Sequence, residues 1–136
     1  MNDLPRQPTE PSTSEHELLV SLVDEGRRRE GRLADGAQRA TDAEPGDAAR
    51  ATLEEIRTEA HALKGAAAVV GQTRLFELAR ALEDLLVDAI AAGSLSQRRA
   101  AAIADAAHAF VEGAVASADG ASEPESVSDS IDNLAA

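Results

Sequence analysis

Residues 53–71, with the sequence LEEIRTEAHALKGAAAVVG, determine the expected fold. The apolar residues of this stretch recur at alternating spacings of three and four: Leu53, Ile56, Ala60, Leu63, Ala67 and Val70. This spacing predicts one amphipathic helix with a single apolar face. Asp47 is expected to be the N-cap of the helix, and Gly71 supplies a left-handed residue that ends it.

Three further segments show the same helical pattern. Thr73 is expected to cap a helix that closes at Gly93, and the apolar face of that helix comprises Leu75, Leu78, Ala79, Leu82, Leu85, Leu86 and Ala89. A helix after Ser96 carries Ile103, Ala107, Phe110, Val111 and Ala114 on one face. A first helix, from about Ser14, offers Leu19, Leu22, Val23, Leu33 and Ala37. The sequence GRRREGR at 26–32 interrupts its stripe, and residues 41–46 are expected to form a loop.

Four amphipathic helices with short connections predict an all-α, antiparallel four-helix bundle. The composition agrees, because aromatic residues make up only 1% of the 136 residues and the small apolar side chains favour close-packed helices. We expect a flexible lead over residues 1–14, the helical bundle over 15–118, and an acidic, disordered tail over 119–136.

The charge balance excludes some classes of partner. With 25 acidic and 13 basic residues the net charge is -12, which argues against nucleic acid and anionic membranes as partners. The absence of cysteine excludes disulfides, thiolate zinc sites and a cysteine nucleophile, and fits a reducing compartment. No apolar run reaches the roughly 18 residues of a membrane span. The expectation is therefore a cytoplasmic protein, most simply a monomer.

His61 is the candidate for chemistry on the central helix. It lies roughly 130° from the middle of the apolar stripe, so it should face water. In an antiparallel hairpin folded about residue 72, Glu83 on the next helix is level with His61. A carboxylate that accepts from the imidazole Nδ1–H would fix the tautomer and leave Nε2 free to attack phosphorus.

Two neighbours of His61 fit the same chemistry. Lys64 follows three residues later on the same face and is the only lysine of the chain, so its charge can offset that of a phosphoryl group. Gly65 removes a side chain where the backbone of another protein can approach.

These residues carry a resemblance to a known family. The segment AHALKGAAAVVG at 60–71 resembles the H-x-L-K-G-x-x-x-x-x-G signature of histidine-containing phosphotransfer (HPt) domains, with five matched positions: His61, Leu63, Lys64, Gly65 and Gly71. The segment LARALEDLL at 78–86 is similar to the following helix of that family, and the resemblance extends over roughly residues 15–118.

Glu83 makes the chain similar to one subgroup of this family, the phosphate-accepting domain of the chemotaxis histidine kinase CheA. In that domain a glutamate at this offset hydrogen-bonds the phosphoacceptor histidine. The chain departs from the subgroup at Arg80, where a histidine is common.

The resemblance implies a phosphorelay intermediate. A histidine kinase would phosphorylate His61 at Nε2, and the phosphoryl group would pass to an aspartate of a response-regulator receiver domain. Glu83 would orient His61, and Lys64 would stabilise the phosphoryl charge. Such a protein needs no metal or cofactor of its own and is a stoichiometric carrier, not an enzyme. The expected docking residues are Arg57, Gly65, Ala68 and Arg80.

Other interpretations remain open at this point. The same bundle can serve as a non-phosphorylated module that binds or sequesters a receiver domain. A carboxylate-bridged metal site is disfavoured, because Asp105-x-x-His108 is the closest approach to the required spacing. His16 and His108 are expected to be ordinary surface or partly buried residues.

Overall fold

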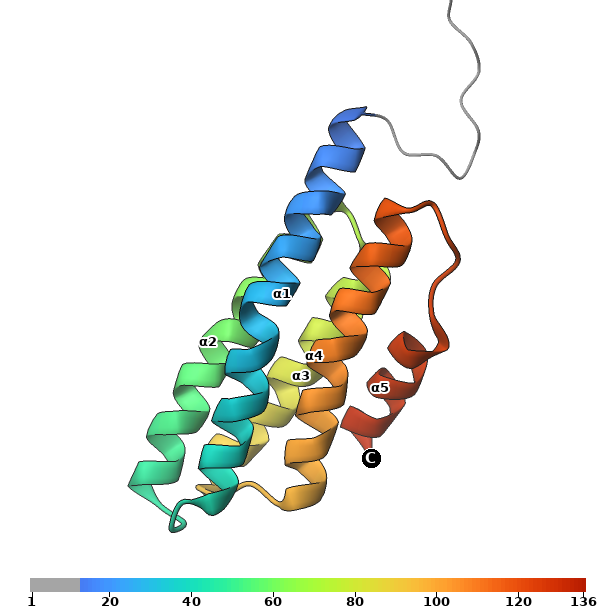
Figure 1. Ribbon diagram of the computed structural model, residues 1–136. Coiled ribbons are helices and arrows are strands. Elements are labelled where there is room, and N and C mark those ends of the chain that lie inside the picture. The colour runs from blue at the N-terminus through green and yellow to red at the C-terminus, as the bar shows by residue number, and fades with distance from the viewer. Residues whose placement is uncertain (1–12) are drawn as a thin grey trace, which may run out of the picture.

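The computed structural model describes residues 13–136, and within this range all of its regular secondary structure is helical. Its elements are α1 (Thr13–Asp42), α2 (Asp47–Val70), α3 (Thr73–Ala92), α4 (Gln97–Ala118) and α5 (Glu125–Ala135). In Figure 1 the four long helices run side by side along one axis, and the short α5 lies beside α3 and α4. The predicted all-α, antiparallel helical bundle is confirmed. The flexible lead expected for residues 1–14 falls almost entirely outside the described residues, and α1 already includes Thr13 and Ser14.

The predicted apolar faces meet in one continuous core. All of the apolar residues expected on α1, α3 and α4 are buried, and so are those of α2 with the exception of Val70 at its end, which is partly buried. Each fully buried leucine contributes roughly 1.5–3 kcal/mol of hydrophobic free energy, so the leucines of α2 and α3 hold the hairpin together.

The helix ends agree with the sequence at three of five predicted positions. Gly71 and Gly93 adopt left-handed φ values of 76° and 70°, and the Ser96 hydroxyl accepts from the amide of Arg99 at 3.2 Å. Asp47 and Thr73 are not N-caps; each is the first residue inside its helix.

The N-caps are displaced by one residue for a structural reason. Gly46 holds the first cap with φ of 122°, a value that favours glycine, and its amide donates to the Gly93 carbonyl at 2.9 Å. This bond joins the two connections at the same end of the bundle. Gln72 holds the second cap, because its carbonyl accepts the first helical bond, from the Phe76 amide.

The helix α1 continues through residues 26–32, where the sequence interrupts its apolar stripe, and the loop that follows is confined to residues 43–46. Gly26 lies where α1 approaches α4 closely, since a Cβ there would be 3.2 Å from Cδ1 of Phe110. Arg29 bridges Glu25 in its own helix and Glu59 in α2. Where the apolar stripe is interrupted, this ion pair therefore links α1 to α2.

The disordered tail expected over residues 119–136 is wrong for most of its length, because α5 folds against α3 and α4. Val127 and Leu134 are buried, and Gly113 of α4 makes room for the former: a Cβ at Gly113 would lie 3.1 Å from Cγ2 of Val127. Arg74 of α3 adds an ion pair with Glu123 at 3.2 Å. The burial of Val127 and Leu134 and the ion pair of Arg74 therefore order a segment whose composition is acidic.

Among the described residues, no helix combines the length and the apolar character that crossing a membrane would require.

Gly36 provides a test of the close contact between α1 and α2. A Cβ at Gly36 would lie 2.2 Å from Cγ2 of Ile56, so Gly36→Ala is expected to lower the free energy of unfolding by about 1–3 kcal/mol through overpacking. Gly31→Ala is the matched control: a Cβ at this position would meet no atom within 4 Å, so the substitution should stabilise α1 by about 0.5–1 kcal/mol. Urea denaturation measures both changes, and equal effects of the two substitutions would contradict this packing.

Candidate functional site

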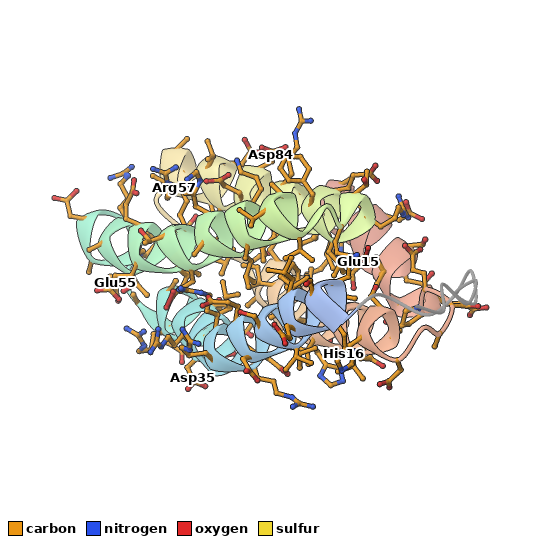
Figure 2. The ribbon with its side chains drawn as sticks, turned by 90° about the horizontal axis from the view of Figure 1, so that it is seen from above. Glu15, His16, Asp35, Glu55, Arg57 and Asp84 are labelled. Carbon is orange, nitrogen blue, oxygen red and sulfur yellow. The ribbon has the colours of Figure 1, made fainter. Side chains whose placement is uncertain are left out.

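His61 lies on the outer face of α2, turned toward α3. Its side chain is 67% exposed, and its Nδ1 is 3.0 Å from Oε2 of Glu83. Figure 2 places Arg57 of α2 and Asp84 of α3 together on one side of the bundle, opposite Asp35 and His16 of α1. The hairpin thus brings His61 and Glu83, 22 residues apart, into direct contact.

The carboxylate of Glu83 is the centre of this group. Glu83 is one of two polar residues among the buried set of the described chain, with 7% of its surface exposed. Besides His61, it accepts a hydrogen bond from Lys64 Nζ at Oε1, over 2.5 Å. The Nη1 atom of Arg57 lies 3.6 Å from Oε2. Three donors of α2 therefore converge on one carboxylate of α3.

The electrostatic balance keeps Glu83 ionised. Burial by itself raises the pKa of this carboxyl, but the hydrogen bonds from Lys64 and His61 outweigh burial and hold its pKa below the ordinary value. An ionised carboxylate can only accept hydrogen bonds, so the 3.0 Å contact requires a proton on Nδ1 of His61. In neutral His61 the second nitrogen, Nε2, then carries a lone pair.

Lys64, which was expected to offset the charge of a phosphoryl group, contacts Glu83 instead. Its side chain is only 26% exposed and is bound to Glu83. The ammonium group lies on the His61 side of α2, but it is already engaged by a carboxylate. The sequence analysis did not predict this contact, because it paired Glu83 with His61 alone and assigned the charge of Lys64 to a phosphoryl group.

The surface next to His61 is open. Gly65 and Ala68 are exposed, and a Cβ at Gly65 would meet no atom within 4 Å. Val69 is 80% exposed, the largest value among the exposed large apolar residues. Val69 was missed by the sequence analysis, although its position off the apolar stripe was a usable signal. Arg80 of α3 is exposed and makes no ion pair within the described part of the chain.

A second histidine has a similar contact elsewhere. Nδ1 of His108 in α4 lies 3.0 Å from Oε2 of Glu30 in α1, and its Nε2 lies 3.6 Å from Oε1 of Glu112. The residue one turn after His108 is thus a second carboxylate, Glu112, whereas the residue one turn after His61 is Lys64. Across residues 13–136, no group of three or more histidine and acidic side chains is arranged to hold a metal ion.

The fold and this site define a class of helical bundles in which an exposed histidine is held by a buried carboxylate of the adjacent helix, with a lysine on the same carboxylate. The family model of the Hpt domain matches residues 17–114, and the chain therefore belongs to the Hpt domain family. Hpt domains are phosphocarrier modules of two-component signalling and interact with histidine kinases and response regulators, so this general phosphotransfer role applies to the chain. Comparisons with curated proteins and with solved structures gave no significant match.

The ionised state of Glu83 predicts a pH dependence of stability. Because its folded-state pKa is depressed below 4.5, Glu83 stabilises the fold above pH 4.5, and this contribution is lost as the pH falls through the folded-state pKa. Glu83→Gln should therefore lower the free energy of unfolding at neutral pH, and its difference from wild type should shrink in acid.

Urea denaturation across this pH range measures the difference. Asp84→Asn, which removes the exposed neighbouring carboxyl, is the matched control and should follow the wild-type profile closely. A difference between Glu83→Gln and wild type that stays constant down to low pH would contradict this interpretation.

Proposed function

We propose that the protein is a phosphorelay intermediate in which His61 accepts a phosphoryl group from a histidine kinase and passes it to an aspartate of a response-regulator receiver domain. The observation that supports the proposal is the 3.0 Å contact between Nδ1 of His61 and the buried carboxylate of Glu83, with the imidazole otherwise exposed. This contact leaves Nε2 as the nucleophilic atom and directs it to solvent, where a partner can reach it.

The chemistry needs no further group from this chain to balance. The Nε2 lone pair attacks phosphorus, the Nε2–P bond forms, and the bond from phosphorus to the leaving atom of the donor breaks. Nδ1 keeps its proton throughout, and the Glu83 carboxylate offsets the positive charge that develops on the ring. In the second step a carboxylate oxygen of the receiver attacks phosphorus, and the imidazole leaves in its neutral form.

The surroundings of His61 suit a dianionic group and a protein partner. Lys64 lies one helical turn away and can donate to a phosphoryl oxygen. Arg57 and Arg80 add positive charge to a molecule whose net charge is -12. Gly65 and Ala68 leave the adjacent helix surface bare, which permits close approach of another backbone. We assign Arg57, Gly65, Ala68 and Arg80 to partner docking.

The phosphorylation site can be tested by intact-mass spectrometry after treatment with phosphoramidate. Wild type should gain one phosphoryl group that is acid-labile and base-stable, and His61→Gln should gain none, because Nε2 of His61 is the proposed acceptor. The matched control is His108→Gln, which removes the other histidine whose Nδ1 contacts a carboxylate and should be modified like wild type.

Addition of a receiver domain should then remove the phosphoryl group from wild type. Modification of His61→Gln to the same extent as wild type would overturn the assignment of His61. Failure of wild type to be modified by phosphoramidate or by histidine kinases, together with retained binding to a receiver, would favour the non-phosphorylated binding module instead.

A further inference from the structure

Arg57 stands between two carboxylates that differ in their exposure to water. Its Nε donates to Oε2 of Glu54 over 3.3 Å, and its Nη1 lies 3.6 Å from Oε2 of Glu83. The Glu54 side chain is 54% exposed, whereas that of Glu83 is 9% exposed. Arg57 is therefore bonded to the hydrated carboxylate and lies just beyond hydrogen-bond distance of the buried one.

Lys64 cannot serve Glu83 and a phosphoryl group on His61 equally well. Its ammonium is bound to Oε1 of Glu83 in this structure. When Lys64 turns toward a phosphoryl group, Glu83 loses its closest cation. The Nδ1–H group of His61 stays bonded to the carboxylate, but a buried charge that loses a cationic partner is strongly destabilised. The site therefore needs a second cation if Lys64 is to be released.

Arg57 can provide that cation at little cost. An exposed ion pair such as Arg57–Glu54 contributes little to stability, because water solvates both groups once they separate. A guanidinium also matches a carboxylate with two parallel N–H donors, so Arg57 can bond Glu83 firmly once Lys64 leaves. The difference in burial between Glu54 and Glu83 favours this exchange.

We propose that Arg57 is a positioning residue that moves from Glu54 to Glu83 as Lys64 moves from Glu83 to the phosphoryl group on His61. Glu83 then keeps a cation in both states, and Nδ1 of His61 keeps its acceptor. This inference rests on the proposed phosphorylation of His61. It assigns Arg57 a role inside the site, in addition to the docking role suggested by its exposed position.

A double-mutant cycle on the rate of His61 phosphorylation by phosphoramidate tests the exchange. The P–N bond of the reagent breaks as Nε2–P forms, and ammonia leaves, so no partner protein enters the measurement. Arg57→Gln should slow the reaction roughly three- to tenfold, because Lys64 then stays on Glu83. An effect of this size is typical of charged groups that share one ion-pair network.

In a Lys64→Gln background, Arg57→Gln should change the rate by less than about twofold, because the partners of Glu83 then remain the same before and after phosphorylation. Arg57→Lys should restore part of the rate. Arg39→Gln is the matched control: it removes an exposed arginine paired with Glu55 at 3.8 Å and should have no effect.

The lone lysine gives a direct readout of its movement. With ¹⁵N-labelled lysine, the Nζ signal belongs to Lys64 alone, and phosphorylation of wild type should shift it strongly. In Arg57→Gln the shift should be much smaller, although His61 is still phosphorylated. A change in folding alone would not uncouple the Nζ signal from the phosphorylation state.

The outcomes distinguish failure of the proposed Arg57 exchange from failure of the proposed phosphorylation of His61. The exchange would be overturned if Arg57→Gln slowed phosphorylation equally in wild type and in Lys64→Gln, and if the Nζ signal of Lys64 shifted on phosphorylation as much in Arg57→Gln as in wild type. His61 would then remain the acceptor. Absence of any phosphoryl group on wild-type His61 would overturn the proposed function, and this inference with it.

Discussion

The carboxylate of Glu83 is buried at the contact between α2 and α3, and the arrangement of the site depends on its negative charge. Without neighbours, a carboxyl in this position would be driven toward its neutral form by desolvation. Lys64 and His61 reverse that tendency, and the pKa of Glu83 is held below its ordinary value. The ionised carboxylate in turn fixes the positions of the side chains that approach it from α2. The fold and the chemistry therefore share one interaction.

The geometry of this interaction follows from the α2–α3 hairpin. Gly71 ends α2 in the left-handed conformation, and α3 begins two residues later, so the two helices run antiparallel in tight register. Leucines on both inner faces hold that register by burial. His61 lies outside this core, on the exposed part of α2 that is turned toward α3, which is why its imidazole can be anchored at Nδ1 and remain open at Nε2. A change in hairpin register by one residue would separate His61 from Glu83.

Sequence periodicity predicted the helices, their buried faces and the level of Glu83 opposite His61, because these features depend on local spacing along the chain. It failed where the outcome depends on contacts between distant segments. The segment that forms α5 has the composition of an acidic, disordered tail, and its order depends on the packing of Val127 against Gly113 of α4. The one-residue shift of the first N-cap depends on the bond between Gly46 and Gly93. The contact of His108 with Glu30 depends on the packing of α1 against α4, which sequence spacing cannot align.

The central claim is that the Glu83 carboxylate holds the proton of His61 on Nδ1 and leaves Nε2 free. Long-range ¹H–¹⁵N correlation spectra of histidine-labelled protein, recorded under conditions in which His61 is neutral, distinguish its two neutral tautomers directly. The account predicts the Nδ1–H tautomer for wild type and a loss of this preference in Glu83→Ala. A wild-type His61 that carries its proton on Nε2 would contradict it.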